Sequence, residues 1–437
     1  MAVKHRQKRP KIALFGHFGA RNFGNESTFQ AMLCHVRRLL PDAEVTCICT
    51  RPETVAEDYG IVAVPMNALL FRSKKNRRWW ARVFRKLFIG IPSELCRWLS
   101  GLTTLWGVDT LIIPGTGLLT DAFSVGGWGP YSTFKWSVIA KACRCQLVFL
   151  SVGAGPLNSA MGRLLVKATL YMADFRSYRD IATVQYLKHI GFRSECDRLY
   201  PDLAFSLPQA LLPERYERKT RRMVVGLGLM DYGGMYGIES TTREEYRKYS
   251  EALAGFVEWL LHRGYDVRLL IGDLADMPAI EEFKALLTVR GMASDPARVV
   301  ADPITSAHGL LSQLAMTDFV VGTRFHNVLL ALLLNKPAMA ISFHHKSSSL
   351  MSQMGLSEYC QDIKGLQGDK VIEQFCQMER NATGLRSMIG EKVEGYRRAL
   401  DEQYALVFEN LLRVPEQSSS EQGVEGLGEV NGKQKWN

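Results

Sequence analysis

Short apolar runs alternate with longer amphipathic segments along most of this 437-residue chain, and this alternation constrains its fold more than any other feature. The apolar runs have the length of buried strands, whereas the segments between them repeat their apolar residues at helical spacing. Strands that alternate with helices form parallel sheets with helices on both faces. The sequence therefore predicts an α/β protein.

The expected elements group into two successive units. In the first, strands are expected at 12–15, 45–49, 110–113, 146–151, 175–178 and 196–200, and helices near 27–40, 133–145, 163–172 and 181–190. In the second, strands are expected at 223–227, 267–271, 298–301, 318–321 and 338–341, and helices near 243–263, 278–289, 306–316 and 328–334. The chain is too long for one ordinary domain, so two are predicted.

Composition places the expected domain boundaries. The first domain is predicted at 11–207 and the second at 223–414, joined by a linker at 208–222 that is rich in proline, glutamate and arginine. A basic extension at 1–10 precedes the first strand and lacks the apolar core of a signal peptide. The tail at 415–437 is rich in Ser, Glu, Gly and Gln, so we expect it to be disordered.

The nine cysteines are scattered and form no Cys-x-x-Cys pair, which favours a reduced, cytoplasmic protein. No apolar run approaches the length of a membrane span. No His/Cys spacing of the zinc-binding type is present, so we expect no metal site.

Positive charge is concentrated in one segment. The formal net charge of the chain is +10, and between Phe71 and Trp98 nine basic residues and one acid, Glu94, give a net charge of +8. The segment also holds three tryptophans and other apolar residues at rough helical spacing. Basic residues interleaved with aromatic ones are typical of segments on an anionic membrane surface. Two alternatives stay open: an exposed helical insertion with a charged face, and a nucleic-acid contact.

The tetrad Arg324-Phe325-His326-Asn327 lies between the expected strand 318–321 and the apolar helix 328–334. Open α/β sheets bind their ligands at the carboxyl ends of strands, where this tetrad would lie. The planar fork of arginine suits phosphate and carboxylate groups. Histidine can give or take a proton near neutral pH. The alternative is that both residues only cap the start of the helix.

Other loops between strands and helices are rich in glycine or charge. The loop 16–26 contains Asn22, Gly24, Asn25 and Glu26 and could bring backbone N–H groups to a ligand, although a plain turn is the alternative. Further candidate positions in later loops are Gly115, Gly117, Asp121, Gly153, Gly155, Arg179 and Lys346. The alternative for Asp121 is a helix cap, and for Arg179 it is a surface ion pair.

Taken in chain order, these loops resemble those of the polysaccharide pyruvyl transferase family. The resemblance rests on the G-x-x-x-x-x-N-x-G-[DN]-E loop at 16–26, the glycine-rich loop that ends in Asp121, and the Val-Gly-Ala-Gly-Pro run at 152–156. It continues with Ser177-x-Arg179-Asp180, Pro201-Asp202, Arg324-x-His326 and Lys346, and covers about residues 11–360. Gly-Thr-Gly stands where a triple glycine is usual, and Phe325 and Asn327 stand where Leu and Ala are common.

The resemblance implies two Rossmann-like domains in a GT-B-like arrangement, with the site in the interdomain cleft. It implies a transferase that moves an enolpyruvyl group from phosphoenolpyruvate to a saccharide and forms a pyruvate ketal. Arg179, Arg324 and Lys346 are expected to bind the phosphate and carboxylate of the donor, and the glycine-rich loops to line the site. His326 is expected to be the general acid, and Asp121 to take the proton of the acceptor hydroxyl. No cofactor is implied beyond phosphoenolpyruvate as donor substrate.

The implied acceptor is a sugar of a cell-surface polysaccharide or its lipid-linked precursor. Together with the basic segment 71–98, it leads us to expect a cytoplasmic protein held peripherally on the inner face of the cell membrane, without a nucleic-acid partner. Two other functions stay open. A GT-B glycosyltransferase that uses a nucleotide sugar would need a ribose-binding carboxylate near 226–231 or at Asp273. A non-catalytic membrane- or polyanion-binding protein would need its cations but not His326.

Overall fold

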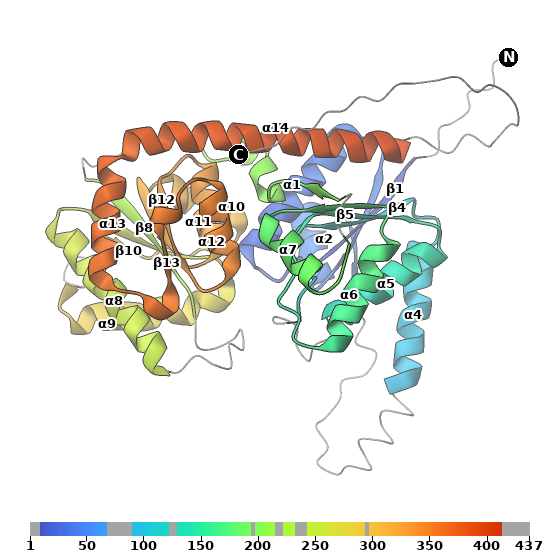
Figure 1. Ribbon diagram of the computed structural model, residues 1–437, viewed down its shortest axis with the longest axis horizontal. Coiled ribbons are helices and arrows are strands. Elements are labelled where there is room, and N and C mark those ends of the chain that lie inside the picture. Colours follow the sequence, from blue (N-terminus) through green and yellow to red (C-terminus); the bar gives the residue numbers. More distant parts are fainter. Residues whose placement is uncertain are drawn as a thin grey trace, which may run out of the picture.

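The computed structural model describes residues 9–67, 90–121, 129–193, 197–214, 222–231, 243–292 and 297–412. These residues form two lobes that lie side by side, each built on a parallel sheet packed between helices (Figure 1). The expectations for residues 1–8 of the N-terminal extension, the C-terminal tail, residues 215–221 of the linker and residues 71–89 of the basic segment fall outside the described residues.

The first lobe is organised around a seven-stranded sheet with strand order β3-β2-β1-β4-β5-β6-β7. Its strands are β1 (Lys11–Gly16), β2 (Glu44–Cys49), β3 (Val62–Pro65), β4 (Thr110–Pro114), β5 (Gln146–Val152), β6 (Phe175–Tyr178) and β7 (Arg198–Leu199). Its helices are α1 (Phe23–Leu39), α2 (Pro52–Tyr59), α4 (Ile91–Leu105), α5 (Gly129–Ala142), α6 (Ala160–Met172) and α7 (Ile181–His189). The central strands β1, β4 and β5 are almost wholly buried, because helices cover both faces of the sheet.

The second lobe contains a six-stranded parallel sheet with strand order β10-β9-β8-β11-β12-β13. Its strands are β8 (Val224–Leu229), β9 (Asp266–Ile271), β10 (Val299–Val300), β11 (Phe319–Gly322), β12 (Ala338–Ser342) and β13 (Cys360–Asp362). Its helices are α8 (Arg243–His262), α9 (Met277–Val289), α10 (Ala307–Ala315), α11 (Phe325–Leu333), α12 (His345–Gln353) and α13 (Gly368–Arg380). Helix α11 is apolar nearly all round, since it packs between the sheet and the first lobe.

Both sheets reverse their strand order next to their first strand, between β1 and β4 and between β8 and β11. Ligands of open α/β sheets bind at the carboxyl ends of the strands beside such a reversal. Loops at these ends come together between the two lobes, because they line one common cavity. The fold therefore places the site in the interlobe cleft.

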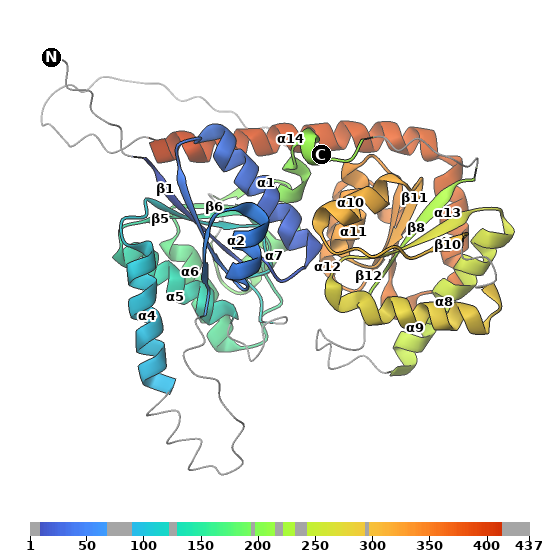
Figure 2. The same cartoon turned by 180° about the vertical axis from the view of Figure 1, so that it is seen from behind.

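Helix α14 (Ala382–Leu412) runs along both lobes as a single helix of 31 residues (Figures 1 and 2). Its second half packs on the first lobe, where the fully buried Gln403 accepts a hydrogen bond from the Ser177 hydroxyl at 2.5 Å. The Gln403 amide also donates to the Ser151 hydroxyl at 3.2 Å. Tyr404 stacks on the ring of His35 from α1, with ring centroids 4.0 Å apart. The predicted domain ranges did not include this return of the chain to the first lobe.

The α/β architecture is confirmed, and most predicted elements differ from the observed ones only at their ends. One shift matters for the site. Helix α11 begins at Phe325 rather than at residue 328, so His326 lies in its first turn and Arg324 immediately precedes it. Elements α2, β3, α12 and β13 and the helices α13 and α14 were not predicted from the sequence.

Gln403→Ala should lower the free energy of unfolding by about 1–3 kcal/mol, because two buried serine hydroxyls lose their partner. Chemical denaturation followed by circular dichroism measures this change. Glu402→Ala, at the exposed neighbouring position, is the matched control and should change stability by less than ~0.5 kcal/mol. Equally small effects of the two substitutions would contradict a bracing role for α14.

Candidate active site between the lobes

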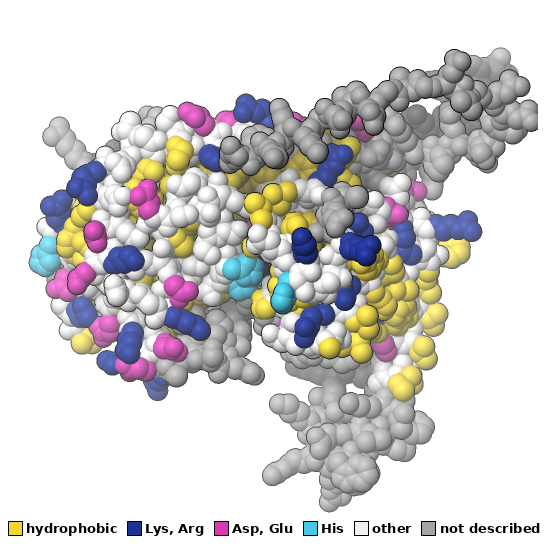
Figure 3. Space-filling view, in the orientation of Figure 1, with side chains coloured by type: hydrophobic (Ala, Val, Ile, Leu, Met, Phe, Trp, Pro, Cys, Tyr) yellow, Lys and Arg dark blue, Asp and Glu magenta, His cyan; other side chains and the backbone are white. Residues whose placement is uncertain are grey.

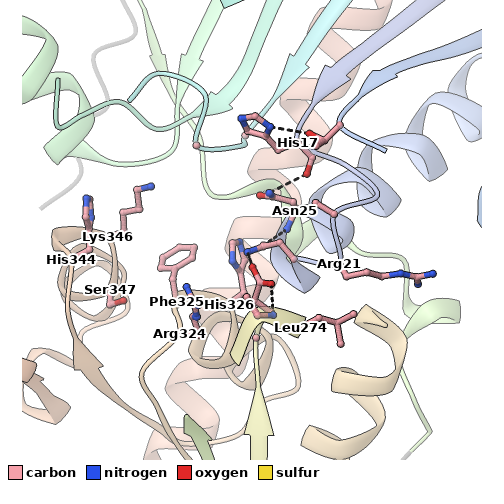
Figure 4. A pocket seen from close by; sticks show the side chains of 18 of the residues that line it. His17, Arg21, Asn25, Leu274, Arg324, Phe325, His326, His344, Lys346 and Ser347 are labelled. Atoms are coloured by element: carbon pink, nitrogen blue, oxygen red, sulfur yellow. Dashed lines mark hydrogen bonds between the residues drawn. The ribbon is translucent and has the colours of Figure 1, made fainter. Parts of the chain in front are cut away.

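A cavity of about 610 Å³ lies between the two lobes, and its lining comes almost equally from both. The first lobe contributes His17, Ala20, Arg21, Asn22, Asn25, Thr50, Arg51, Gly115, Gly117 and Arg179. The second lobe contributes Gly272, Asp273, Leu274, Ala275, Arg324, Phe325, His326, Phe343, His344, Lys346 and Ser347. Histidine side chains are visible at the junction of the lobes in Figure 3, and Figure 4 shows the lining from close by.

The lobes touch at one edge of this cavity, where the start of α1 meets the loop after β9. The Asn22 amide donates to the carboxylate of Asp273 at 2.8 Å, and the Phe23 N–H donates to the Gly272 carbonyl at 3.1 Å. Asn22 also caps α1, because its side chain accepts from the Asn25 N–H. One short loop thus starts a helix and joins the lobes.

Gly24 lies directly against the His326 imidazole of the other lobe. A Cβ added at Gly24 would be 1.8 Å from His326 Nδ1, so any side chain here would displace the ring. Gly24 was predicted as a substrate-binding residue, but it is not part of the cavity lining. Its position instead lets the two lobes approach closely enough to seat His326.

His326 projects from the first turn of α11 toward the middle of the site (Figure 4). Its Nε2 atom is buried and has no hydrogen-bond partner among the described residues. The pKa of His326 is lowered to about 4, mainly by burial. The Asp202 carboxylate opposes this shift, and the positive charges of Arg179, Lys346 and Arg324 add to it. The imidazole is therefore neutral at pH 7 in the ligand-free protein.

Arg324 lines the cavity, but its guanidinium is held by a carboxylate. Its Nε and one terminal nitrogen donate to the two oxygens of the fully buried Asp276, at 2.8 and 2.5 Å. Such a fork-to-fork pair fixes the guanidinium plane. The arginine is thus oriented before any ligand arrives.

Arg179 reaches the same site from the first lobe. It is 6% exposed and forms ion pairs with Asp202 at 3.0 Å and Asp180 at 3.5 Å. Its guanidinium carbon lies 5.1 Å from the centre of the Phe325 ring, so a cation–π contact spans the lobes. Gly153 makes room for it, because a Cβ there would be 2.8 Å from Arg179 Nε. The alternative of a surface ion pair is excluded by this burial.

Lys346 lies in the first turn of α12 and lines the cavity opposite the loop after β4. Burial, and after it the charge of Arg179, lower the pKa of Lys346 to about 7. A Cβ at Gly117 would lie 3.6 Å from Lys346 Nζ, which brings the two lobes together here as well. Gly115 also lines the cavity and packs tightly on the Ser151 carbonyl.

Besides Gly24 and Gly153, three more predicted site residues are not among the described residues that line the cavity. The Asp121 carboxylate accepts hydrogen bonds from the N–H groups of Asn158 and Ser159 before α6, and it is not among the described residues that line the cavity. Glu26 is buried beside the cavity and accepts from the Gly19 N–H at 2.8 Å. Burial raises the pKa of Glu26 to about 7. Gly155, at φ +83°, packs on Tyr186. These three residues stabilise the conformation of their loops. The hydrogen bonds of Asp121 to the N–H groups before α6 fit a helix cap better than a role in proton transfer.

The structure also brings in residues that the sequence analysis did not select, notably His17, Arg51 and His344. His17 Nδ1 lies 3.0 Å from the Thr50 hydroxyl, and burial lowers the pKa of His17. Thr50 and Arg51 follow β2, next to β1 in the sheet. The rule that ligands bind at carboxyl ends of strands would have identified this loop, had β2 been placed beside β1.

The lining as a whole suits a small anionic ligand. Arg179, Arg324 and Lys346 lie around a neutral imidazole, and the carboxylates that pair with these arginines are not among the described residues that line the cavity. A ligand with two acidic groups would find several N–H donors within one cavity.

Two Rossmann-like lobes that face each other across such a cleft define the GT-B class of fold. Solved structures agree: the S. aureus MnaA–UDP complex matches with a TM-score of 0.58 at 12% identity, covering 94% of this chain and 100% of that one. A putative UDP-N-acetylglucosamine 2-epimerase from Listeria monocytogenes matches with a TM-score of 0.57 at 12% identity, covering 92% and 98%. At these identities the likeness establishes the fold alone, and it confirms the predicted GT-B arrangement.

The chain itself belongs to the polysaccharide pyruvyl transferase family, because residues 22–345 match the model of that family. The resemblance inferred from the loops is thereby confirmed. The chain is also 26% identical, over 152 residues, to the amylovoran biosynthesis protein AmsJ of Erwinia amylovora. That match covers 34% of this chain and 36% of AmsJ, so it spans about a third of the relative's length.

The ligand-free protein should lose stability as the pH falls from about 6.5 to 4. The unfolded chain binds a proton at residue 326 near pH 6.5, whereas the folded chain binds it only near pH 4, so acid favours unfolding in this window. His326→Gln should flatten the pH dependence of the melting temperature. His308→Gln, on the exposed surface of α10, should leave it unchanged. Identical curves for both variants and the wild type would contradict the burial of a neutral imidazole.

Proposed function

We propose that this protein transfers an enolpyruvyl group from phosphoenolpyruvate to a saccharide and forms a pyruvate ketal on a cell-surface polysaccharide or its lipid-linked precursor. Family membership supports the reaction class. The observation that carries the proposal is the buried Nε2 of His326, without a described partner, among Arg179, Arg324 and Lys346. In this proposal His326 carries a proton inside a cavity that binds an anionic donor.

Donor binding follows from charge. Phosphoenolpyruvate carries a phosphate and a carboxylate, and each needs positively charged N–H donors once it leaves water. Arg179 and Lys346 approach from opposite lobes, and Arg324 is already oriented by Asp276. Arg179 keeps its acidic partners, so the net attraction comes from the whole cavity rather than from one arginine. A donor that bridges the lobes would also favour a closed cleft.

The donor would change the protonation of His326. Anionic groups near an imidazole stabilise its charged form, so the bound donor raises the pKa of His326 from its low ligand-free value. The imidazolium can then protonate the methylene carbon of the donor, which leaves an oxocarbenium-like centre at the neighbouring carbon. The neutral ligand-free state thus becomes a general acid only when the donor is present.

The rest of the reaction balances with two acceptor hydroxyls. The first attacks the cationic carbon and loses its proton. The carbon–phosphate ester bond then breaks, the second hydroxyl attacks, and its proton leaves with the phosphate. Overall, one proton has reached the new methyl group and one the released phosphate.

A base is needed on the acceptor side, and the position of Asp121 does not suit it. We assign this role to His17, on the wall opposite Lys346 and His344 (Figure 4). The Thr50 hydroxyl orients the ring through Nδ1, and burial favours the neutral form, which can accept a proton. His17 and His326 would then act as base and acid from different lobes.

A nucleotide-sugar glycosyltransferase remains the rival, because GT-B neighbours include a complex with UDP. It requires a carboxylate for the ribose, and Asp273 lines the cavity at the predicted place. However, the two carboxylate oxygens of Asp273 already accept hydrogen bonds from the Asn22 amide and the Ala275 N–H. This occupation favours the pyruvyl transferase proposal.

Phosphoenolpyruvate should raise the melting temperature, and UDP-N-acetylglucosamine should not, because ligands stabilise the state they bind. At a ligand concentration of 100 Kd, the gain is about 2.7 kcal/mol. Lys346→Met should abolish the shift, whereas Lys370→Met on the exposed surface of α13 should keep it. Stabilisation by the nucleotide sugar alone would overturn the proposal.

His326→Gln should lower turnover by ~10²–10⁴-fold, the usual contribution of a general acid, and keep donor binding. His17→Asn should also lower turnover, and the melting shift with phosphoenolpyruvate should stay intact. Release of inorganic phosphate in the presence of an acceptor measures both rates. Wild-type turnover of His326→Gln would remove the assigned acid, and wild-type turnover of His17→Asn would remove the assigned base.

A further inference from the structure

Exposed apolar side chains gather on two helices of the first lobe. Of the thirteen large hydrophobic residues that are well exposed among those the structure describes, six lie on α4 and α6. They are Ile91, Leu95 and Leu99 on α4 and Met161, Leu164 and Tyr171 on α6, each 54–62% exposed. We call this set the α4/α6 face. Figure 3 shows hydrophobic side chains concentrated on this side of the first lobe.

The face is continuous because α5 connects its two rows. Helix α5 packs against both α4 and α6, and all three precede or follow strands of one parallel sheet, so they run in the same direction. The α4 residues are spaced by four, which puts them on one stripe of the helix. Phe134 and Val138 of α5 are half-buried and also spaced by four. An unpartnered apolar surface of this kind marks an interaction site.

Charge on the face is almost entirely positive. Helix α6 carries Arg163 and Lys167 and no acid. The one acid of α4, Glu94, is held by Arg97 at 2.8 Å and by the buried Lys135 of α5 at 3.2 Å. Apolar side chains with basic neighbours and neutralised acids complement an anionic lipid surface. They do not complement nucleic acid, which needs positive charge without a large apolar area.

One end of the face lies at the same edge of the first sheet as the loops that line the cavity. Its three helices have their N-termini at the carboxyl ends of the strands, which is the edge that lines the cleft. Helix α6 starts just after the loop of Gly153, on which Arg179 rests. A flat surface in contact with the α4/α6 face would therefore pass close to the cleft. No helix in the described ranges is long and apolar enough to cross a bilayer, so the contact would be peripheral.

We propose that the α4/α6 face docks the protein on an anionic bilayer. The proposal rests on described residues outside the cavity and does not depend on the proposed reaction. It differs from the expectation for residues 71–98, because four of the six apolar residues, Leu99 and the three on α6, lie outside that segment. Docking would bring the cleft to acceptors attached to lipids.

Co-sedimentation with vesicles of phosphatidylcholine and phosphatidylglycerol tests the proposal without any assay of activity. The double variant Leu95→Glu/Leu164→Glu should reduce the bound fraction at least several-fold, with an unchanged melting temperature since both residues are exposed. Val289→Glu is the matched control, because Val289 is 86% exposed on α9 of the other lobe and should bind as wild type. Added salt should weaken binding, because it screens Arg163 and Lys167.

Equal sedimentation of the double variant and the wild type would overturn the proposal, as would no binding by the wild type. If the wild type bound equally to vesicles of pure phosphatidylcholine and to anionic vesicles, the proposed contribution of Arg163 and Lys167 would be wrong. A concentration-dependent dimer that the double variant abolishes, without vesicle binding, would assign the face to a second copy of the chain instead.

Discussion

The approach of Gly24 to the His326 ring is the contact on which the rest of the site depends. It joins the first turn of α1 in one lobe to the first turn of α11 in the other, and it tolerates no side chain. The Asn22–Asp273 and Phe23–Gly272 hydrogen bonds hold the same edge, and α14 braces the lobes along another side. Because the lobes are held together at this edge, Arg179 and Lys346 face one cavity from opposite sides, and the Nε2 atom of His326 is buried.

Burial and positive charge then determine the chemistry. Each arginine is oriented by a buried carboxylate, so the cations are in place before a ligand arrives and need little rearrangement. The same environment keeps His326 neutral and lowers the pKa of Lys346 to about 7. The ligand-free site is thus unfavourable for protons. In the proposed mechanism an anionic donor would reverse both effects, so that its binding gives His326 the proton that it transfers.

Local sequence patterns predicted the parallel α/β lobes, because the alternation of strands and helices is repeated many times along the chain. They also identified Arg179, Arg324, His326 and Lys346, which lie at the carboxyl ends of strands where such folds bind ligands. They failed where a role depends on distant contacts. Asp121 was predicted to take the acceptor proton and Glu26 to line the substrate site, but their carboxylates accept backbone hydrogen bonds. Gly24 is needed because the His326 ring of the other lobe packs against it, a contact that the local sequence does not reveal. The sequence around His17 shows only a glycine-rich loop and does not mark the histidine as a site residue.

If the donor supplies the charge that protonates His326, its binding must be accompanied by proton uptake. Isothermal titration of phosphoenolpyruvate at pH 7, in buffers of different ionisation enthalpy, gives the number of protons exchanged. We expect the wild type to take up protons on balance, because the bound anion would raise the pKa of His326 and of Lys346. His326→Gln should take up fewer protons with similar affinity. Phosphoenolpyruvate binding without proton uptake, or with proton release, would contradict this mechanism, since His326 could not then gain its proton from donor binding.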